Sequence, residues 1–142
     1  MKKIICLLFS TLLFTGTAYA EEKVAVIVNS ANTQSLSMLD IKNIYSDIVT
    51  TWKNGKTISV YNLPLKSPAR EKFSEGVLKM SASSAEMELN NLKITNRMKN
   101  TQKEKREKLV VSIVAKNPVA IGYVSSSLVD NKTGIRVLFE LD

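Results

Sequence analysis

The sequence of 142 residues contains no histidine, and its one cysteine is Cys6. Proteins build zinc sites mainly from cysteine and histidine, so no metal site of that kind is expected. A Ser-His-Asp or Cys-His catalytic arrangement cannot be assembled without histidine. A single cysteine also cannot form an internal disulfide, and the fold must therefore rest on its hydrophobic core.

The first twenty residues show the pattern of a secretory signal peptide. Lys2 and Lys3 form a charged start, Ile4 to Phe14 is an apolar run, and Ala18-Tyr19-Ala20 offers small residues suited to cleavage. The apolar run is too short and wrongly flanked for a membrane span. We therefore expect residues 1–20 to be removed on export.

Export of this kind predicts a bacterial periplasmic protein that begins at Glu21. Cys6 lies too far before the cleavage site to carry a lipid, so the mature chain would have no cysteine and no transmembrane anchor. Residues 21–142 suit one domain with one core.

Positive charge is concentrated in the basic segment, residues 93–108. This segment holds seven lysines and arginines against Glu104 and Glu107, a net charge of +5. In an exported protein such a segment indicates an acidic envelope partner, an anionic surface or merely a solvated helix. Nucleic acid is not an expected partner, because that inference belongs to the cytoplasm.

Short apolar runs alternate with helix signals along the chain. The patterns predict strands over residues 24–28, 57–61, 119–124 and 135–141, and helices over 38–47, from 68 to about 80, from 83 to 98 and over 104–116. Continuous apolar strands are typical of sheets covered on both faces. This order predicts an α/β fold, a three-layer sandwich with a mixed sheet flanked by helices.

Several side chains carry their own expectations. Ser83 and Glu86 match a capping box at the start of a helix. Leu109 has the helical spacing of a core residue, and Trp52 is expected to close the edge of the core. Gly122 is expected to permit close packing or a kink in its strand.

An enzyme is the least favoured class. General acid–base catalysis needs carboxylates with shifted pKa values in a cleft. Asp40, Asp47, Glu71 and Glu75 all fall on predicted helix surfaces. We expect no catalytic residue, no cofactor and no metal.

The stretch from Val60 to Lys72 joins a strand to a helix that opens at Ser67-Pro68. Serine is a preferred N-cap and proline is favoured at the first helical position. Because helix starts that follow strands can hold small anions, Ser67 is a helix cap or an anion ligand. Arg70 is a solvated charge, a partner of Glu75, or an anion ligand.

Three stretches together resemble the phosphate-type substrate-binding proteins of ABC transporters, which have the type 2 periplasmic-binding-protein fold. The stretches are Val26-Ile27-Val28-Asn29 with the helix that ends at Ile44-Tyr45, the unit around Ser67, and Asn117-Pro118-Val119-Ala120-Ile121-Gly122-Tyr123-Val124. Full-length members have two lobes that close on a ligand. This chain is about half that size and resembles a small, single-lobed relative.

The resemblance implies a ligand site at Ser67, Ala69 and Arg70. Family members have a serine-glycine-threonine run at this helix start, but Pro68 here lacks the N–H of the glycine and Ala69 lacks the hydroxyl of the threonine. Leu63 stands where an arginine would lie, and Arg70 is expected to compensate in part. Asn29 is interpreted first as a turn former, with ligand contact at the edge of the lobe as the alternative.

These patterns lead to two hypotheses of different class. The first is a periplasmic, non-enzymatic, solute-binding-like protein that binds phosphate or another small anion weakly, in a transport-accessory or sensory role. The second is a protein-interaction module of the cell envelope that has lost its ligand site and docks through the basic segment. Pairing of two copies into a two-lobed cleft is a further possibility.

Overall fold

A computed structural model describes residues 22–142, so the predicted signal peptide and its cleavage site lie outside the described residues. The strands are β1 (Val24–Asn29), β2 (Ser59–Asn62), β3 (Lys103–Glu104), β4 (Ala120–Ser125) and β5 (Ile135–Leu141). The helices are α1 (Met38–Tyr45), α2 (Pro68–Phe73), the π-helical η1 (Ser74–Leu78), α3 (Ala82–Ile94), α4 (Glu107–Lys116) and the 3-10 turn η2 (Ser126–Leu128).

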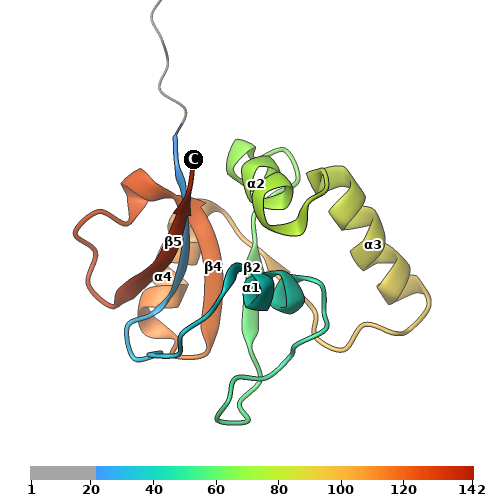
Figure 1. Cartoon of the computed structure of the whole chain (residues 1–142), viewed down its shortest axis with the longest axis horizontal. Helices are drawn as coiled ribbons and strands as arrows, with labels where there is room; N and C mark the ends of the chain where they lie inside the picture. Colours follow the sequence, from blue (N-terminus) through green and yellow to red (C-terminus); the bar gives the residue numbers. More distant parts are fainter. Residues whose placement is uncertain (1–21) are drawn as a thin grey trace, which may run out of the picture.

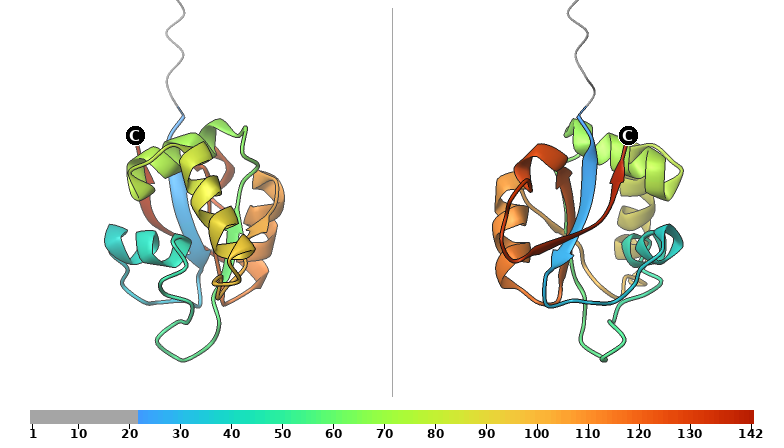
Figure 2. Two further views of the ribbon diagram at one scale, coloured as in Figure 1. Left: turned by 90° about the vertical axis from the view of Figure 1, so that its right-hand side faces the viewer. Right: turned by 60° about the vertical axis from the view of Figure 1, so that its left-hand side comes forward.

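The strands form one mixed sheet in the order β3-β2-β4-β1-β5. β2 runs parallel to β3 and β4, whereas β1 lies between β4 and β5 and is antiparallel to both. Helix α4 covers one face of the sheet, and α1, α2 and α3 lie on the other (Figures 1 and 2). This arrangement confirms the predicted three-layer α/β sandwich, and it explains why every residue of β1 is buried.

An aromatic cluster joins α1 and α2 to the sheet. The rings of Phe73 and Tyr123 stack with centroids 3.9 Å apart, and Tyr45 meets them edge-on at 4.7 and 5.7 Å. The hydroxyl of Tyr45 donates to the carbonyl of Tyr61 at 2.8 Å, and that of Tyr123 donates to the side-chain oxygen of Asn62. Both buried tyrosines thus combine ring packing with a satisfied polar end.

Helix α4 approaches the opposite face closely because β4 has a glycine there. A Cβ atom on Gly122 would lie 2.5 Å from Cγ1 of Val110, too near for any real contact. Gly122 therefore permits close packing, as predicted.

The helix starts were predicted with mixed success. The capping box of α1 is present, with the Ser37 hydroxyl accepting from the Asp40 N–H and the Asp40 carboxylate accepting from the Ser37 N–H. The capping box at Ser83 and Glu86 is wrong, because Ser81 is the N-cap of α3 and accepts from the N–H of Ser84. Glu86 instead forms an ion pair with Arg70, a partner that the sequence spacing does not reveal.

The start of α4 also differs from the prediction. Glu104 was expected to begin the helix and Lys103 to lie in a loop before it, but the two residues pair with Tyr61 and Asn62 as the edge strand β3. Leu109 is 47% exposed rather than inward-facing, and Val110, Val111 and Val114 are the helix's buried residues. The pairing of β3 delays the helix by three residues, to Glu107.

Asp47 was expected on a helix surface, but it is buried. Its backbone is left-handed (φ 61°), just beyond α1. Its carboxylate accepts from the N–H groups of Lys99 and Asn100 at 2.7 and 2.8 Å. Asp47 therefore fixes the loop that leads to β3. Trp52 is buried and donates to the carbonyl of Val119 at 3.0 Å, which confirms its place at the edge of the core.

Gly122→Ala should lower the free energy of unfolding by about 1–3 kcal/mol, because the new methyl group overlaps Val110. Urea unfolding followed by circular dichroism measures the loss. Val110→Ala opens space at the same contact, so the double variant should be more stable than the two separate losses predict. Strictly additive losses would contradict the close approach of α4.

Candidate ligand-binding site

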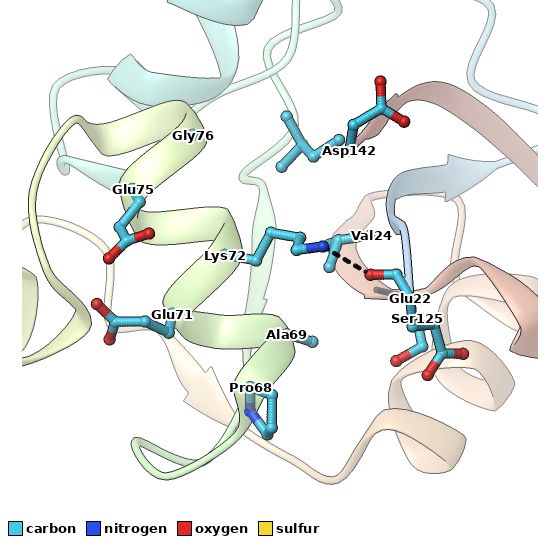
Figure 3. A pocket seen from close by; sticks show the side chains of 11 residues that line it. Glu22, Val24, Pro68, Ala69, Glu71, Lys72, Glu75, Gly76, Ser125 and Asp142 are labelled. Atoms are coloured by element: carbon cyan, nitrogen blue, oxygen red, sulfur yellow. Dashed lines mark hydrogen bonds between the residues drawn. The ribbon is translucent and has the colours of Figure 1, made fainter. Parts of the chain in front are cut away.

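A groove of about 750 Å³ opens at the end of the sheet where β1 begins and where β4 and β5 finish. One wall is α2, which contributes Pro68, Ala69 and Lys72, and the other includes Val24 and Leu141. Figure 3 shows the ammonium group of Lys72 directed across the groove, where it donates to the backbone carbonyl of Glu22 at 2.9 Å. The groove therefore lies beside the first turn of α2, where the sequence predicts a ligand site.

The charge around this groove is mainly negative. Four acidic residues line it, Glu22, Glu71, Glu75 and Asp142, whereas Lys72 is the one basic residue of the lining within residues 22–142. Glu71 accepts from the N–H of Ala82, which ties α2 to the start of α3. In Figure 3 the carboxylates of Glu71 and Glu75 turn to the other side of α2 from Lys72. Carboxylates near the groove lower its attraction for an anion.

The first turn of α2 presents polar groups that make no hydrogen bond with any other group of residues 22–142. Ser67 is the N-cap residue and Pro68 follows it in the helix, as predicted, but the Ser67 hydroxyl makes no capping bond. The prediction of a side-chain cap at Ser67 is therefore wrong. Within residues 22–142, no hydrogen bond engages the N–H of Ala69 or of Arg70, while the N–H of Glu71 donates to the Ser67 carbonyl.

The side chain of Arg70 takes neither of the ordinary roles expected for it. It is 2% exposed, so it is not a solvated charge, and it pairs with Glu86 rather than with Glu75. One guanidinium nitrogen donates to the carbonyl of Leu63 at 3.0 Å, and the other lies 2.5 Å from the Glu86 carboxylate. The guanidinium faces β2 and α3, whereas Ala69 lines the groove on another side of α2.

Asn29 is separated from the other predicted ligand residues. Val24 lines the groove, and Asn29 is five residues further along β1, about 17 Å away at the rise of a strand. Its side-chain oxygen accepts from the N–H of Ala31 at 2.9 Å, and its amide donates to the carbonyl of Val114 at 2.8 Å. These contacts confirm that Asn29 forms the turn after β1.

Sequence reasoning missed the polar cluster at the end of β2. Asn62 accepts from the Tyr123 hydroxyl and from the N–H of Leu63, and donates to Gln102 at 2.9 Å. Burial raises the pKa of Tyr123, and that of Tyr45, above the usual value of tyrosine. Both hydroxyls therefore keep their protons at neutral pH and serve as hydrogen-bond donors. No spacing along the chain links these residues.

With the fold and the groove described, the chain can be compared with known protein families. It belongs to the family described as the PBP superfamily domain, whose sequence profile matches residues 14–139. No curated protein matches the sequence. Across residues 22–142, no helix has the length and apolar character needed to cross a membrane.

Two solved structures share the fold. An ABC-type phosphate transport receptor from Vibrio cholerae superposes with a TM-score of 0.62 at 20% identity, over 82% of this chain and 45% of that one. A protein from Clostridium perfringens, described as a phosphate ABC transporter substrate-binding protein with bound phosphate, gives 0.60 at 19% identity, over 82% and 44%. The chain thus spans less than half of these relatives and matches one lobe of a periplasmic-binding-protein-like fold.

Alkaline pH should destabilise the protein through its buried tyrosines. Tyr45 and Tyr123 ionise near pH 10 when unfolded, but their pKa values are raised in the folded chain. Their contribution to stability is therefore complete below about pH 10 and is lost as the pH rises further.

Urea unfolding between about pH 8 and about pH 11.5 tests this expectation. Tyr123→Phe cannot ionise at that position, so its free energy of unfolding should fall less steeply than that of the wild type. Parallel curves for the two proteins would contradict the role assigned to Tyr123.

Proposed function

We propose that the chain is a non-enzymatic, solute-binding-like protein of the periplasm that holds a small anion weakly, in a transport-accessory or sensory role. The proposal rests on the first turn of α2. There the Ser67 hydroxyl and the N–H groups of Ala69 and Arg70 have no hydrogen-bond partner within residues 22–142, and Ala69 lines the groove. N–H groups of this kind are the usual anion donors of α/β proteins. Phosphate is the reference ligand, because it is the anion named for both relatives.

The same geometry argues for weak binding. Pro68 supplies no N–H, and the Arg70 guanidinium is directed away from the groove to Leu63 and Glu86. A hydrogen bond to a charged group contributes about 1.5–3 kcal/mol, so each missing donor lowers the affinity appreciably. The negative charge of the acidic residues around the groove adds repulsion. A dissociation constant of roughly 1 mM, equivalent to about 4 kcal/mol, fits two N–H donors and one hydroxyl.

Calorimetric titration of the mature chain with phosphate, sulfate and acetate tests the proposal. We expect binding at millimolar concentrations, weakened by Ser67→Ala and strengthened by Pro68→Gly, which adds an N–H to the first turn. Ser81→Ala removes a serine from the start of α3 and is the matched control, with binding unchanged. Absence of heat and of thermal shift with every anion, in the wild type and in Pro68→Gly, would overturn the proposal.

A second candidate function is a protein-interaction module of the cell envelope. The basic segment, residues 93–108, favours it. Its seven lysines and arginines are all exposed, and within residues 22–142 none of them forms a salt bridge. Met87 and Ile94, on the outer side of the adjoining helix α3, are 71% and 84% exposed. Unpaired cations beside exposed apolar side chains suit an acidic protein surface.

Charge reversal tests this second candidate. We expect cross-linking in the periplasm to capture one specific partner, whose capture is lost when Lys103, Lys105 and Arg106 are changed to glutamate. The matched control reverses Lys53, Lys56 and Lys66, three exposed lysines outside the basic segment. Capture at full strength by the first triple variant would show that the basic segment is only a solvated surface.

A further inference from the structure

We propose that Glu86 occupies a second anion-binding site, built around the guanidinium of Arg70, from which an inorganic oxyanion such as phosphate or sulfate can displace its carboxylate. This site faces α3 and the end of β2, on another side of α2 from the groove. Anion binding at this second site can therefore be tested separately from the binding proposed at the groove.

The guanidinium of Arg70 is held in place before any ligand arrives. Its side chain is 2% exposed, and one nitrogen is oriented by the bond to the Leu63 carbonyl. The other nitrogen meets the Glu86 carboxylate at 2.5 Å, and the Glu104 carboxylate lies further away, at 3.8 Å. A buried, oriented arginine is the usual receptor for planar carboxylates and for phosphates, since both accept paired N–H bonds.

The Glu86 end of the pair is open to solvent. Its side chain is 32% exposed, while that of Arg70 is almost fully enclosed. Without Glu86, the buried guanidinium would keep only the longer contact to Glu104 at 3.8 Å, so a group that displaces Glu86 must itself carry negative charge to replace it. A small oxyanion arriving from solvent meets this requirement.

Helix α3 is attached to the rest of the fold by few large side chains. Its buried residues are Ala82, Ala85 and Leu89, and it packs chiefly on η1. Figure 1 shows α3 at the outer side of the molecule, beyond α2. The aromatic cluster and the sheet do not depend on α3. Glu86 can therefore leave Arg70 through a shift of α3 while the core remains folded.

The test compares phosphate and sulfate binding by the wild type with that of Glu86→Gln, which removes the charge and keeps the size of the side chain. We expect Glu86→Gln to bind both anions at least tenfold more tightly, because the internal competitor has lost its charge. Glu88→Gln, an exposed carboxylate two residues along the same helix, is the matched control and should bind like the wild type. Equal affinity of Glu86→Gln and Glu88→Gln would overturn the proposal.

A second substitution tests whether the gain in anion affinity depends on Arg70. Arg70→Met in the Glu86→Gln background should abolish the added affinity, and a gain that survives it would exclude Arg70 as the receptor. Should Glu86→Gln be partly unfolded, phosphate should restore its thermal midpoint in a saturable manner; no recovery counts against the site.

Hydrogen exchange in the wild type gives an independent measurement. Phosphate at concentrations that populate the site should increase amide exchange across residues 82–94 and leave β4 unchanged, and unchanged exchange in α3 at saturation would contradict displacement of Glu86. Binding by Glu86→Gln alone would support this second site and exclude the groove. If instead the wild type binds, Ser67→Ala weakens binding and Glu86→Gln leaves it unchanged, the groove is supported and the second site is excluded.

Discussion

The stacking of Phe73 on Tyr123 is the contact on which the position of α2 depends. Phe73 ends α2 and Tyr123 lies in the central strand β4, so their stack fixes the helix across the end of the sheet. Tyr45 closes the cluster from α1, and its hydroxyl is satisfied by the carbonyl of Tyr61 in β2. The groove beside α2 exists because this packing holds the helix at the carboxyl ends of β2 and β4. The opposite face imposes the complementary constraint, since Gly122 brings α4 close to the same strand.

The distribution of charge around α2 decides what its first turn can bind. The one arginine of this turn is buried against Leu63 and Glu86, and the residues that line the groove are more often acidic than basic. Within residues 22–142, the cation that lines the groove beside the N–H groups of this turn is Lys72, whose ammonium group donates to the carbonyl of Glu22. The fold favours an anion ligand, whereas the charge of the groove does not, because more acidic than basic residues line it.

The part of the chain that matches these relatives corresponds to one of their lobes. Within residues 22–142 the groove is open to solvent at the end of the sheet, and an anion at the proposed site would remain hydrated on one side. Water screens the charge interactions of such a ligand and lowers their value compared with a closed cleft. This openness and the missing donors both support the proposal that an anion would bind weakly.

The sequence by itself determined the class of fold. The apolar runs of β1, β4 and β5, the capping box of α1 and the Ser67-Pro68 start of α2 are local signals, because they follow from backbone geometry and from burial of neighbouring residues. The tertiary structure decided where the polar side chains go. Glu86 lies 16 residues from Arg70, and Asp47 lies 52 residues from Lys99, so no helical or strand period relates them. Such pairs form because buried charges require partners, and only the folded chain determines which partner lies within reach.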